Sequence, residues 1–262
     1  MDLGIKNKVA VVLAASKGLG RAAAESLAAE GCRLAVCSRD AANIIETARD
    51  IEKDYGIEVL AEAVDVRDEM SIKAFIDKTS EKFGEVDILV TNAGGPPVKP
   101  FMDTTEKEWH YWYDQTFMSV VRSIKAVIPY MQKNKWGRII NITSVSVKAP
   151  VENLIYSNAL RMAVIGLSKT LAMELGPSGI IVNNVAPGYH STDGLERVIQ
   201  NKMAGGMSRD EVLKTWTDKI PLQRIGVPED LAGLITFLAS DRASYMTGTT
   251  IQIDGGMYTG TM

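Results

Sequence analysis

Cysteine and histidine, on which many metal centres and disulfide frameworks depend, are scarce in this sequence. Its 262 residues include two cysteines, Cys32 and Cys37, and two histidines, His110 and His190. Two cysteines cannot build a disulfide framework or a four-cysteine zinc site. We therefore expect no metal ion in the chemistry of this protein.

The sequence also lacks an excess of charge and any long apolar run. It has 29 lysine and arginine residues against 32 aspartate and glutamate residues, a net charge of −3, so the basic surface of a general nucleic-acid binder is not expected. The early apolar run from Val9 to Ala15 has seven residues, whereas a helix that spans a bilayer needs about 20. Residues 1–8 show no basic segment followed by an apolar one, as a secretory signal would. We expect a cytoplasmic protein with neither a nucleic-acid nor a membrane partner.

Apolar residues are plentiful, and their spacing predicts the fold class. They make up 46% of the chain, enough for a sizeable core, and this excludes a disordered protein. Short apolar runs predict strands at Val9–Ala14, Leu34–Cys37, Val59–Ala63, Ile88–Thr91, Arg138–Ile142, Ile181–Ala186 and Thr250–Ile253. Longer amphipathic stretches predict helices at Leu19–Glu30, Ala41–Asp54, Glu69–Phe83, Met118–Asn134, Leu154–Leu175 and Pro228–Leu238. This alternation indicates a doubly wound α/β (Rossmann) fold, a seven-stranded parallel sheet with helices on both faces.

One segment interrupts the alternation. Residues Ser191–Ile220 are polar and contain the flexible sequence Met203-Ala-Gly-Gly-Met207. Because strand and helix signals resume directly after it, we interpret it as a mobile helical lid over the substrate and not as a linker. The prediction is a single domain over residues 1–262, with the lid at 191–220.

A glycine-rich turn, Ala14–Gly20, follows the first predicted strand. Small residues at such a turn let the backbone approach a phosphate, and the N-terminus of the following helix attracts it. The alternative is a tight turn that merely needs glycine. Its place at the end of the first strand of an α/β chain favours a phosphate site.

From this turn onward the sequence resembles the short-chain dehydrogenase/reductase family. The family pattern is Thr-Gly-x-x-x-Gly-x-Gly; Gly18 and Gly20 match it, whereas Leu13 and Ala14 replace its first two residues. Four further family motifs follow in order at predicted strand ends: Asp65-Val66, Asn92-Ala93-Gly94, Pro187-Gly188 with Thr192, and Asp254-Gly255-Gly256. The resemblance covers almost the whole chain. Within the family, the sequence resembles 3-oxoacyl-[acyl-carrier-protein] reductase-like and glucose-dehydrogenase-like members.

The resemblance implies an oxidoreductase that binds a nicotinamide dinucleotide at the carboxyl ends of the strands. Asp65 would lie at the adenine, and His190 would lie at the nicotinamide with its ring incidental to the chemistry. The implied cofactor-binding residues are Ala14, Ser16, Lys17, Gly18, Leu19, Gly20, Ser38, Arg39, Asp65, Val66, Asn92, Ala93, Gly94, Arg161, Pro187, Gly188, His190 and Thr192. A homotetramer is also implied, and the many apolar residues of the helices predicted at Met118–Asn134 and Leu154–Leu175 agree with it.

The residues after the second predicted strand favour NADP(H) over NAD(H). A carboxylate there would accept hydrogen bonds from the ribose 2′-hydroxyl of NAD and would repel a 2′-phosphate. This sequence has Ser38 and Arg39 at that point, and Lys17 lies in the glycine turn. One hydroxyl and two cations suit a phosphate. The alternative is that both cations are solvated surface charges.

The catalytic residues of the family are only partly present. In the family a Ser orients the carbonyl, a Tyr passes a proton, a Lys four residues later lowers the Tyr pKa, and an Asn holds a water. Ser144, in Asn141-Ile-Thr-Ser-Val145, matches the serine. Counting from the aromatic segment that begins at Trp109 places Thr116 in the Asn position.

The Tyr and Lys positions are both altered. Counting 13 residues on from Ser144 puts Ser157 in the Tyr position, and Arg161 then lies in the Lys position. Tyr156 lies one residue early, which turns it by roughly 100° on a helix. Tyr156 could reach the site only if the helix begins there or carries a bulge. Tyr156 is the candidate acid, with Ser157 in its place as the alternative and Arg161 as the candidate cation.

Two functions are therefore compatible with the sequence. The first is an NADP(H)-dependent oxidoreductase that acts on the carbonyl or secondary alcohol of a small molecule, such as a 3-oxoacyl compound or a sugar. The second is a dinucleotide-binding regulatory protein with little or no turnover, which the altered Tyr, Lys and Asn positions would explain. The first is favoured because hydride transfer depends chiefly on how cofactor and carbonyl are placed.

Overall fold

A computed structural model describes residues 2–261 and shows one sheet of seven parallel strands. The strand order is β3-β2-β1-β4-β5-β6-β7. The strands are β1 (Val9–Val12), β2 (Arg33–Ser38), β3 (Val59–Ala63), β4 (Ile88–Thr91), β5 (Gly137–Ile142), β6 (Ile180–Pro187) and β7 (Thr250–Ile253). The chain builds outward from β1 in one direction and from β4 in the other. This reversal opens a crevice at the carboxyl ends of β1 and β4, where doubly wound folds bind ligands.

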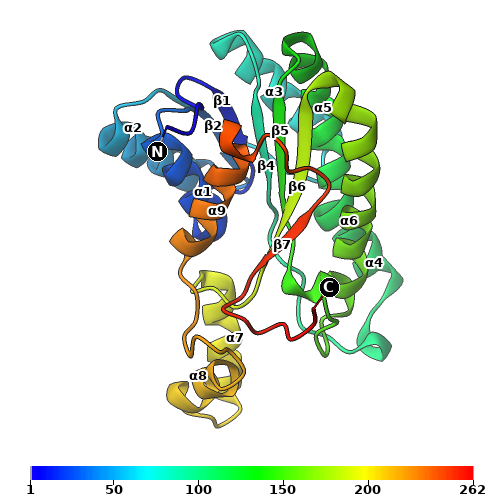
Figure 1. Ribbon diagram of the computed structural model, residues 1–262. Coiled ribbons are helices and arrows are strands. Elements are labelled where there is room, and N and C mark those ends of the chain that lie inside the picture. Colours follow the sequence, from blue (N-terminus) through cyan, green and yellow to red (C-terminus); the bar gives the residue numbers. More distant parts are fainter. Residues whose placement is uncertain (1, 262) are drawn as a thin grey trace.

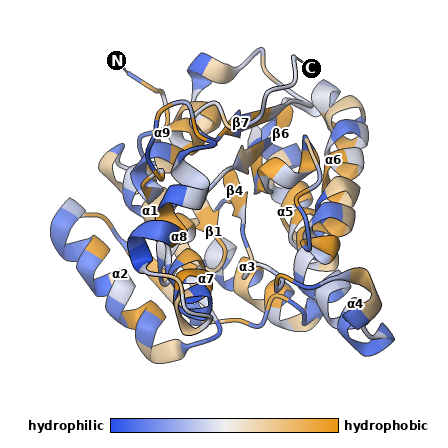
Figure 2. Ribbon diagram, turned by 90° about the horizontal axis from the view of Figure 1, so that it is seen from below, coloured by the Kyte–Doolittle hydropathy of each residue, from blue (hydrophilic) through white to orange (hydrophobic). Residues whose placement is uncertain are grey.

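Helices cover both faces of the sheet (Figure 1). One face carries α1 (Gly18–Ala29), α2 (Ala41–Tyr55) and α9 (Pro228–Ala239), and the other carries α3 (Glu69–Phe83), α5 (Ser119–Asn134) and α6 (Ile155–Leu175). Each face has its own apolar core, and Figure 2 shows the apolar strands β1 and β4 between the two layers of helices. The predicted fold class is therefore confirmed. Within residues 2–261, no helix has both the length and the apolar character needed to cross a membrane.

The sequence prediction missed one helix, α4 (Glu106–Tyr113). Its start is marked by a capping box, in which the Thr105 hydroxyl accepts from the Glu108 N–H and the Glu108 carboxylate accepts from the Thr105 N–H. A π-helical turn over Asp114–Met118 joins α4 to α5, so α5 begins at Ser119 and not at Met118 as predicted.

The segment predicted as a lid forms two helices, α7 (Asp193–Ala204) and α8 (Arg209–Thr217). They pack on each other through a small separate core of Ile199, Val212 and Trp216. Both lie beyond the carboxyl ends of the strands, at the bottom of Figure 1. The lid role and the single-domain boundaries stay predictions.

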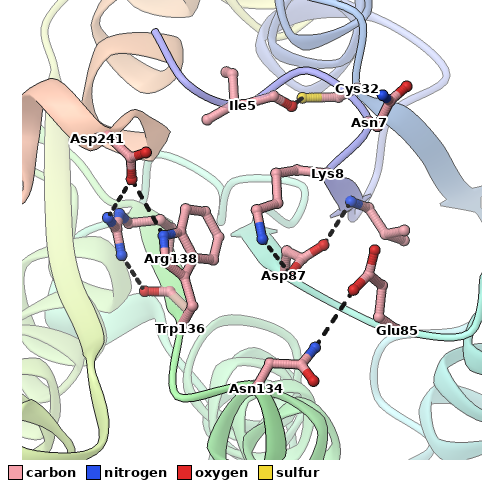
Figure 3. Close-up of polar contacts among 12 residues, drawn as sticks. Ile5, Asn7, Lys8, Cys32, Glu85, Asp87, Asn134, Trp136, Arg138 and Asp241 are labelled. Atoms are coloured by element: carbon pink, nitrogen blue, oxygen red, sulfur yellow. Dashed lines mark hydrogen bonds and ion pairs between the residues drawn. The ribbon is translucent and has the colours of Figure 1, made fainter.

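A network of charged and aromatic side chains closes the amino ends of the strands (Figure 3). Asp87 is fully buried and accepts from Lys8 Nζ at 3.1 Å and from the Val9 N–H at 2.9 Å. The Trp136 ring lies between Lys8 Nζ, 4.2 Å from its centroid, and the Arg138 guanidinium carbon, 4.1 Å from it. Arg138 in turn pairs with Asp241 at 3.2 Å. The charges at this edge satisfy one another, whereas the opposite edge carries the candidate site.

Candidate functional site

The glycine turn Ala14–Gly20 lies at the carboxyl end of β1 and is tied to β4. The Asn92 side-chain amide donates to the Ala14 carbonyl oxygen at 3.3 Å. A Cβ at Gly20 would lie 2.4 Å from that oxygen and 2.8 Å from Asn92 Nδ2, so no other residue fits there. Ala14 itself has φ 49°, a left-handed conformation that costs a non-glycine residue about 1 kcal/mol. The family's glycine at this position avoids that strain.

The N-terminus of α1 offers unpaired N–H groups to an anion. Lys17 is its N-cap and makes no side-chain cap hydrogen bond, and the first turn contains no acidic residue. Gly18 and Thr192, the N-cap of α7, line the same cavity of about 420 Å³. Free N–H groups and the helix dipole at such a terminus attract phosphate groups. Along the turn, Ser16 accepts a hydrogen bond from Thr47 through its carbonyl oxygen, and Leu19 packs on the core.

The three residues predicted to hold a 2′-phosphate lie near this turn but differ in availability. Lys17 is exposed and pairs with Asp193 of α7 at 2.8 Å. Arg39 is exposed and has no carboxylate within 4.0 Å among the described residues. The buried Ser38 hydroxyl donates to the Asp40 carbonyl oxygen at 2.8 Å, so its hydrogen is already used inside the chain.

The predicted adenine residues follow β3. The Asp65 carboxylate accepts from Arg67 Nε at 3.0 Å and also from Arg67 Nη2. These hydrogen bonds hold the pKa of Asp65 below its usual range, so it stays ionised. Val66 is buried, and its side chain belongs to the core under α3.

Buried polar side-chain atoms without partners occur in the π-helical turn before α5 and after β6. Gln115 Oε1, Thr116 Oγ1 and His190 Nε2 have no hydrogen-bond partner within residues 2–261. A Cβ at Gly94 would lie 3.9 Å from Gln115 Nε2, which places this amide beside Asn92-Ala93-Gly94 after β4. Burial without partners costs free energy, so these atoms indicate a polar ligand.

His190 lies after β6, beyond Pro187 and Gly188. Its Nδ1 lies 3.3 Å from the Gly188 carbonyl oxygen, and burial lowers its pKa, so the ring is neutral at physiological pH. A Cβ at Gly188 would lie 2.7 Å from Asp254 Cβ, so this glycine permits a close approach to the motif after β7.

These features fit a nicotinamide dinucleotide. The turn at α1 can hold a pyrophosphate, exposed cations can hold a ribose phosphate, and the partnerless polar atoms can pair with a carboxamide and a ribose. The described residues contain no group of three or more histidine, cysteine or acidic side chains that could hold a metal ion.

Three serines meet at the end of β5. Ser144 caps the short turn Val145–Val147, and its Oγ accepts from the Ser146 N–H at 3.1 Å. The Ser146 and Ser157 hydroxyl oxygens lie 3.1 Å apart, and both side chains are buried. Ser157, the residue in the family's Tyr position, is therefore hydrogen-bonded to the serine turn through Ser146.

Arg161 lies one helical turn after Ser157 on α6. Its Nη1 donates to the Ile142 carbonyl oxygen at 3.0 Å, at the same strand end as Ser144. No carboxylate of the described chain pairs with it, and burial lowers its pKa to about 10. The structure thus holds a half-buried cation beside the serines, without a carboxylate partner among the described residues.

Tyr156 points away from this group. Its side chain is fully buried, its hydroxyl donates to Glu108 Oε2 at 3.2 Å, and its ring lies edge-on to Trp109 with centroids 4.7 Å apart. Burial and the Glu108 charge raise its pKa, the opposite of what an acid needs. No hydrogen bond joins it to Ser144 in the described chain. In this structure Tyr156 therefore does not reach Ser144, and its role as the acid stays a prediction. Because α6 is regular from Ile155 onward, the one-residue offset turns this side chain toward α4.

A cavity of about 400 Å³ opens beside the N-terminus of α6. It lies between residues 99–101 and 150–158, and Asn158 clamps the second segment with two hydrogen bonds to the Val151 backbone. Sequence reasoning missed Gln115, Arg67 and Glu108 at the site. Only Glu108 had a local signal, since it completes the Thr-x-x-Glu capping box.

Comparisons with known proteins agree with this arrangement. A family model described as Enoyl-(Acyl carrier protein) reductase matches residues 13–258. The 3-oxoacyl-[acyl-carrier-protein] reductase FabG of Staphylococcus epidermidis is 37% identical over 252 residues, which cover 96% of this chain and 99% of the relative. FabG of Escherichia coli K12 is 36% identical over 259 residues, covering 98% of this chain and 99% of the relative.

Solved structures are similar over the same length. L-Sorbose reductase from Gluconobacter frateurii, complexed with NADPH and L-sorbose, has a TM-score of 0.95 and 32% identity, covering 99% of this chain and 100% of that chain. YwfH, an NADPH-dependent reductase involved in bacilysin biosynthesis, has a TM-score of 0.92 and 30% identity, covering 97% and 100%. The predicted family, fold and enzyme class, an oxidoreductase, are confirmed. The comparisons give no support to the inactive regulatory protein.

Proposed function

We propose that this chain, which belongs to the short-chain dehydrogenase/reductase family, transfers a hydride between NADP(H) and the carbonyl or secondary alcohol of a small molecule. One observation carries this proposal. The carboxyl ends of the strands bring together a glycine-rich turn, the exposed cations Lys17 and Arg39, and a serine turn beside Arg161.

The cofactor would lie across the carboxyl ends of the strands. The turn Ala14–Gly20 would bind the pyrophosphate, and Asp65-Val66 would border the adenine. Arg39 and Lys17 would bind the 2′-phosphate, the latter after leaving Asp193. The segments Asn92–Gly94 and Pro187–Thr192 would hold the nicotinamide end. When bound, NADP(H) supplies or accepts the hydride.

At the reacting carbon, the chain's own groups orient the substrate and move the proton. Ser144 Oγ would donate to the carbonyl oxygen, and the Arg161 charge would stabilise the negative charge that develops there. Ser157 Oγ, paired with Ser146, would relay the proton from solvent. Because a serine is a much weaker acid than a tyrosine, we expect slow but measurable turnover.

The cofactor assignment is tested by calorimetric titration. NADPH should bind at least several-fold more tightly than NADH, and Arg39→Asp should reverse the order. Equal affinities in the wild type would refute the 2′-phosphate site. Tight NADPH binding without NADPH oxidation across a broad carbonyl panel would instead support a regulatory protein.

We also propose that the enzyme is a cytoplasmic homotetramer. Met162 and Met173 are 47% and 70% exposed on the outer side of α6, where a second copy could cover them. Sedimentation velocity that shows only a species near 28.5 kDa would contradict this assembly.

A further inference from the structure

Three side chains from separate parts of the chain meet at the proposed adenosine end. Arg39 follows β2, Arg67 follows β3, and Tyr111 lies on α4. Arg39 Nη1 donates to the Tyr111 hydroxyl oxygen in a long contact of 3.5 Å. The Arg67 guanidinium carbon lies 4.6 Å from the centroid of the Tyr111 ring. Tyr111 therefore touches both arginines.

Arg67 is held firmly, and this fixes the Tyr111 ring. Its guanidinium forms three hydrogen bonds with the Asp65 carboxylate, and its carbonyl oxygen accepts from Arg122 Nη1 at 2.7 Å. Arg122 also pairs with Asp114 in the π-helical turn, at 2.9 Å. These contacts connect the loop after β3 to the helices α4 and α5.

Arg39, in contrast, is held only by the Tyr111 hydroxyl among the described residues. An exposed arginine loses rotamer entropy when a ligand orders it. A side chain already held in one direction loses less on binding, which raises affinity for the ligand it faces. Arg39 is also the proposed phosphate ligand without a competing carboxylate, since Lys17 is paired with Asp193.

We propose that Tyr111 determines cofactor specificity, because its hydroxyl positions Arg39 for the 2′-phosphate of NADP(H). The inference rests on the proposed function and adds a residue from α4 to it. Tyr111 is a positioning residue, because it acts on the phosphate through Arg39. Its ring, stacked on Arg67, contributes equally to the binding of NADPH and NADH. Its hydroxyl contributes only to the binding of NADPH, which carries the 2′-phosphate.

The test is Tyr111→Phe, which removes the hydroxyl and keeps the ring on Arg67. Tyr113→Phe is the matched control, because Tyr113 lies on the same helix, is 43% exposed, and packs on Phe117 with centroids 5.6 Å apart. Dissociation constants for NADPH, NADH and the probe 2′,5′-ADP are measured by calorimetry. The loss of one hydrogen bond should weaken NADPH and 2′,5′-ADP about 3- to 10-fold in Tyr111→Phe. NADH affinity and all three affinities of the control should stay within about twofold of the wild type.

Two results would overturn the inference while the proposed function stands. Unchanged NADPH affinity in Tyr111→Phe would make Tyr111 a packing residue, and an equal loss for NADH would make it a general nucleoside contact. A wild type that binds NADPH no more tightly than NADH would instead refute the cofactor choice itself, and the inference with it. Thermal melting of each variant shows that folding is intact.

Discussion

Replacing Tyr156 by phenylalanine tests whether the site is assembled around Ser157 and Arg161. If the hydroxyl of Tyr156 serves only Glu108, the variant should keep its turnover number within about threefold of the wild type. A missing general acid would instead cost about 10²–10⁴-fold. The two outcomes are therefore far enough apart for a standard NADPH oxidation assay.

Tyr156→Phe should reduce stability, because it removes a hydrogen bond to a charged partner. Such bonds contribute about 1.5–3 kcal/mol. The Glu108 carboxylate keeps its partners Lys99, at 2.7 Å, and Thr105, so no charge is left unpaired. We therefore expect a loss of about 1–2 kcal/mol, which for a chain of this size lowers the melting temperature by roughly 2–8 °C.

Ser157→Ala and Arg161→Leu are the paired comparisons. Ser157→Ala should lower turnover about tenfold if its hydroxyl relays the proton, whereas Arg161→Leu should lower both turnover and NADPH affinity. The reasoning is refuted if Tyr156→Phe loses more than about 100-fold in turnover at saturating NADPH while Ser157→Ala loses nothing. In that case α6 must rearrange to bring the tyrosine to Ser144.

Gly20→Ala should weaken NADPH binding at least about tenfold, because its methyl group would lie 2.4 Å from the Ala14 carbonyl oxygen and force the phosphate turn open; unchanged calorimetric affinity would argue against a phosphate site. Asp87→Ala should lower the free energy of unfolding in urea by about 3 kcal/mol, because it leaves Lys8 without its buried partner. Glu108→Gln should lower the melting temperature at neutral pH. The folded pKa of Glu108, about 2, lies below its ordinary value of 4.5, so its contribution should be lost as the pH falls from about 4.5 to 2.

The fold could be predicted because its signals are local. The predicted bounds of β3, β4, β7 and α3 coincide with those of the structure, and most other elements end within two residues of prediction. Apolar runs and helical spacing show which residues are buried, whichever residues cover them. They can therefore be recognised in the sequence without knowing which residues pack against them. The positions of the glycine turn and of Ser144 at strand ends could be predicted for a related reason. Carboxyl ends of parallel strands share one edge, so residues that follow different strands must meet there.

The direction of single side chains could not be predicted. Whether Tyr156 or Ser157 faces the serine turn depends on the residue at which α6 begins. A shift of one residue along a helix turns a side chain by roughly 100°. The partner that receives Tyr156, Glu108, lies on α4, a helix the prediction missed. Likewise, nothing near Arg39 in the sequence indicates Tyr111, because that contact joins residues 72 positions apart. Such pairings depend on tertiary packing.

The polar groups at the amino ends of the strands differ from those at the carboxyl ends in whether they have partners within the chain. At the amino edge, Asp87 and Arg138 have their hydrogen-bond partners within the chain. At the carboxyl ends, Arg161 is a half-buried cation without a carboxylate partner in the described chain, and Gln115 and Thr116 each have a buried side-chain atom without a hydrogen-bond partner. An unpaired buried charge or dipole lowers the stability of the free protein. A polar ligand that pairs with these groups recovers that free energy when it binds. The groups without partners at the carboxyl ends therefore lower the stability of the free protein and raise its affinity for such a ligand.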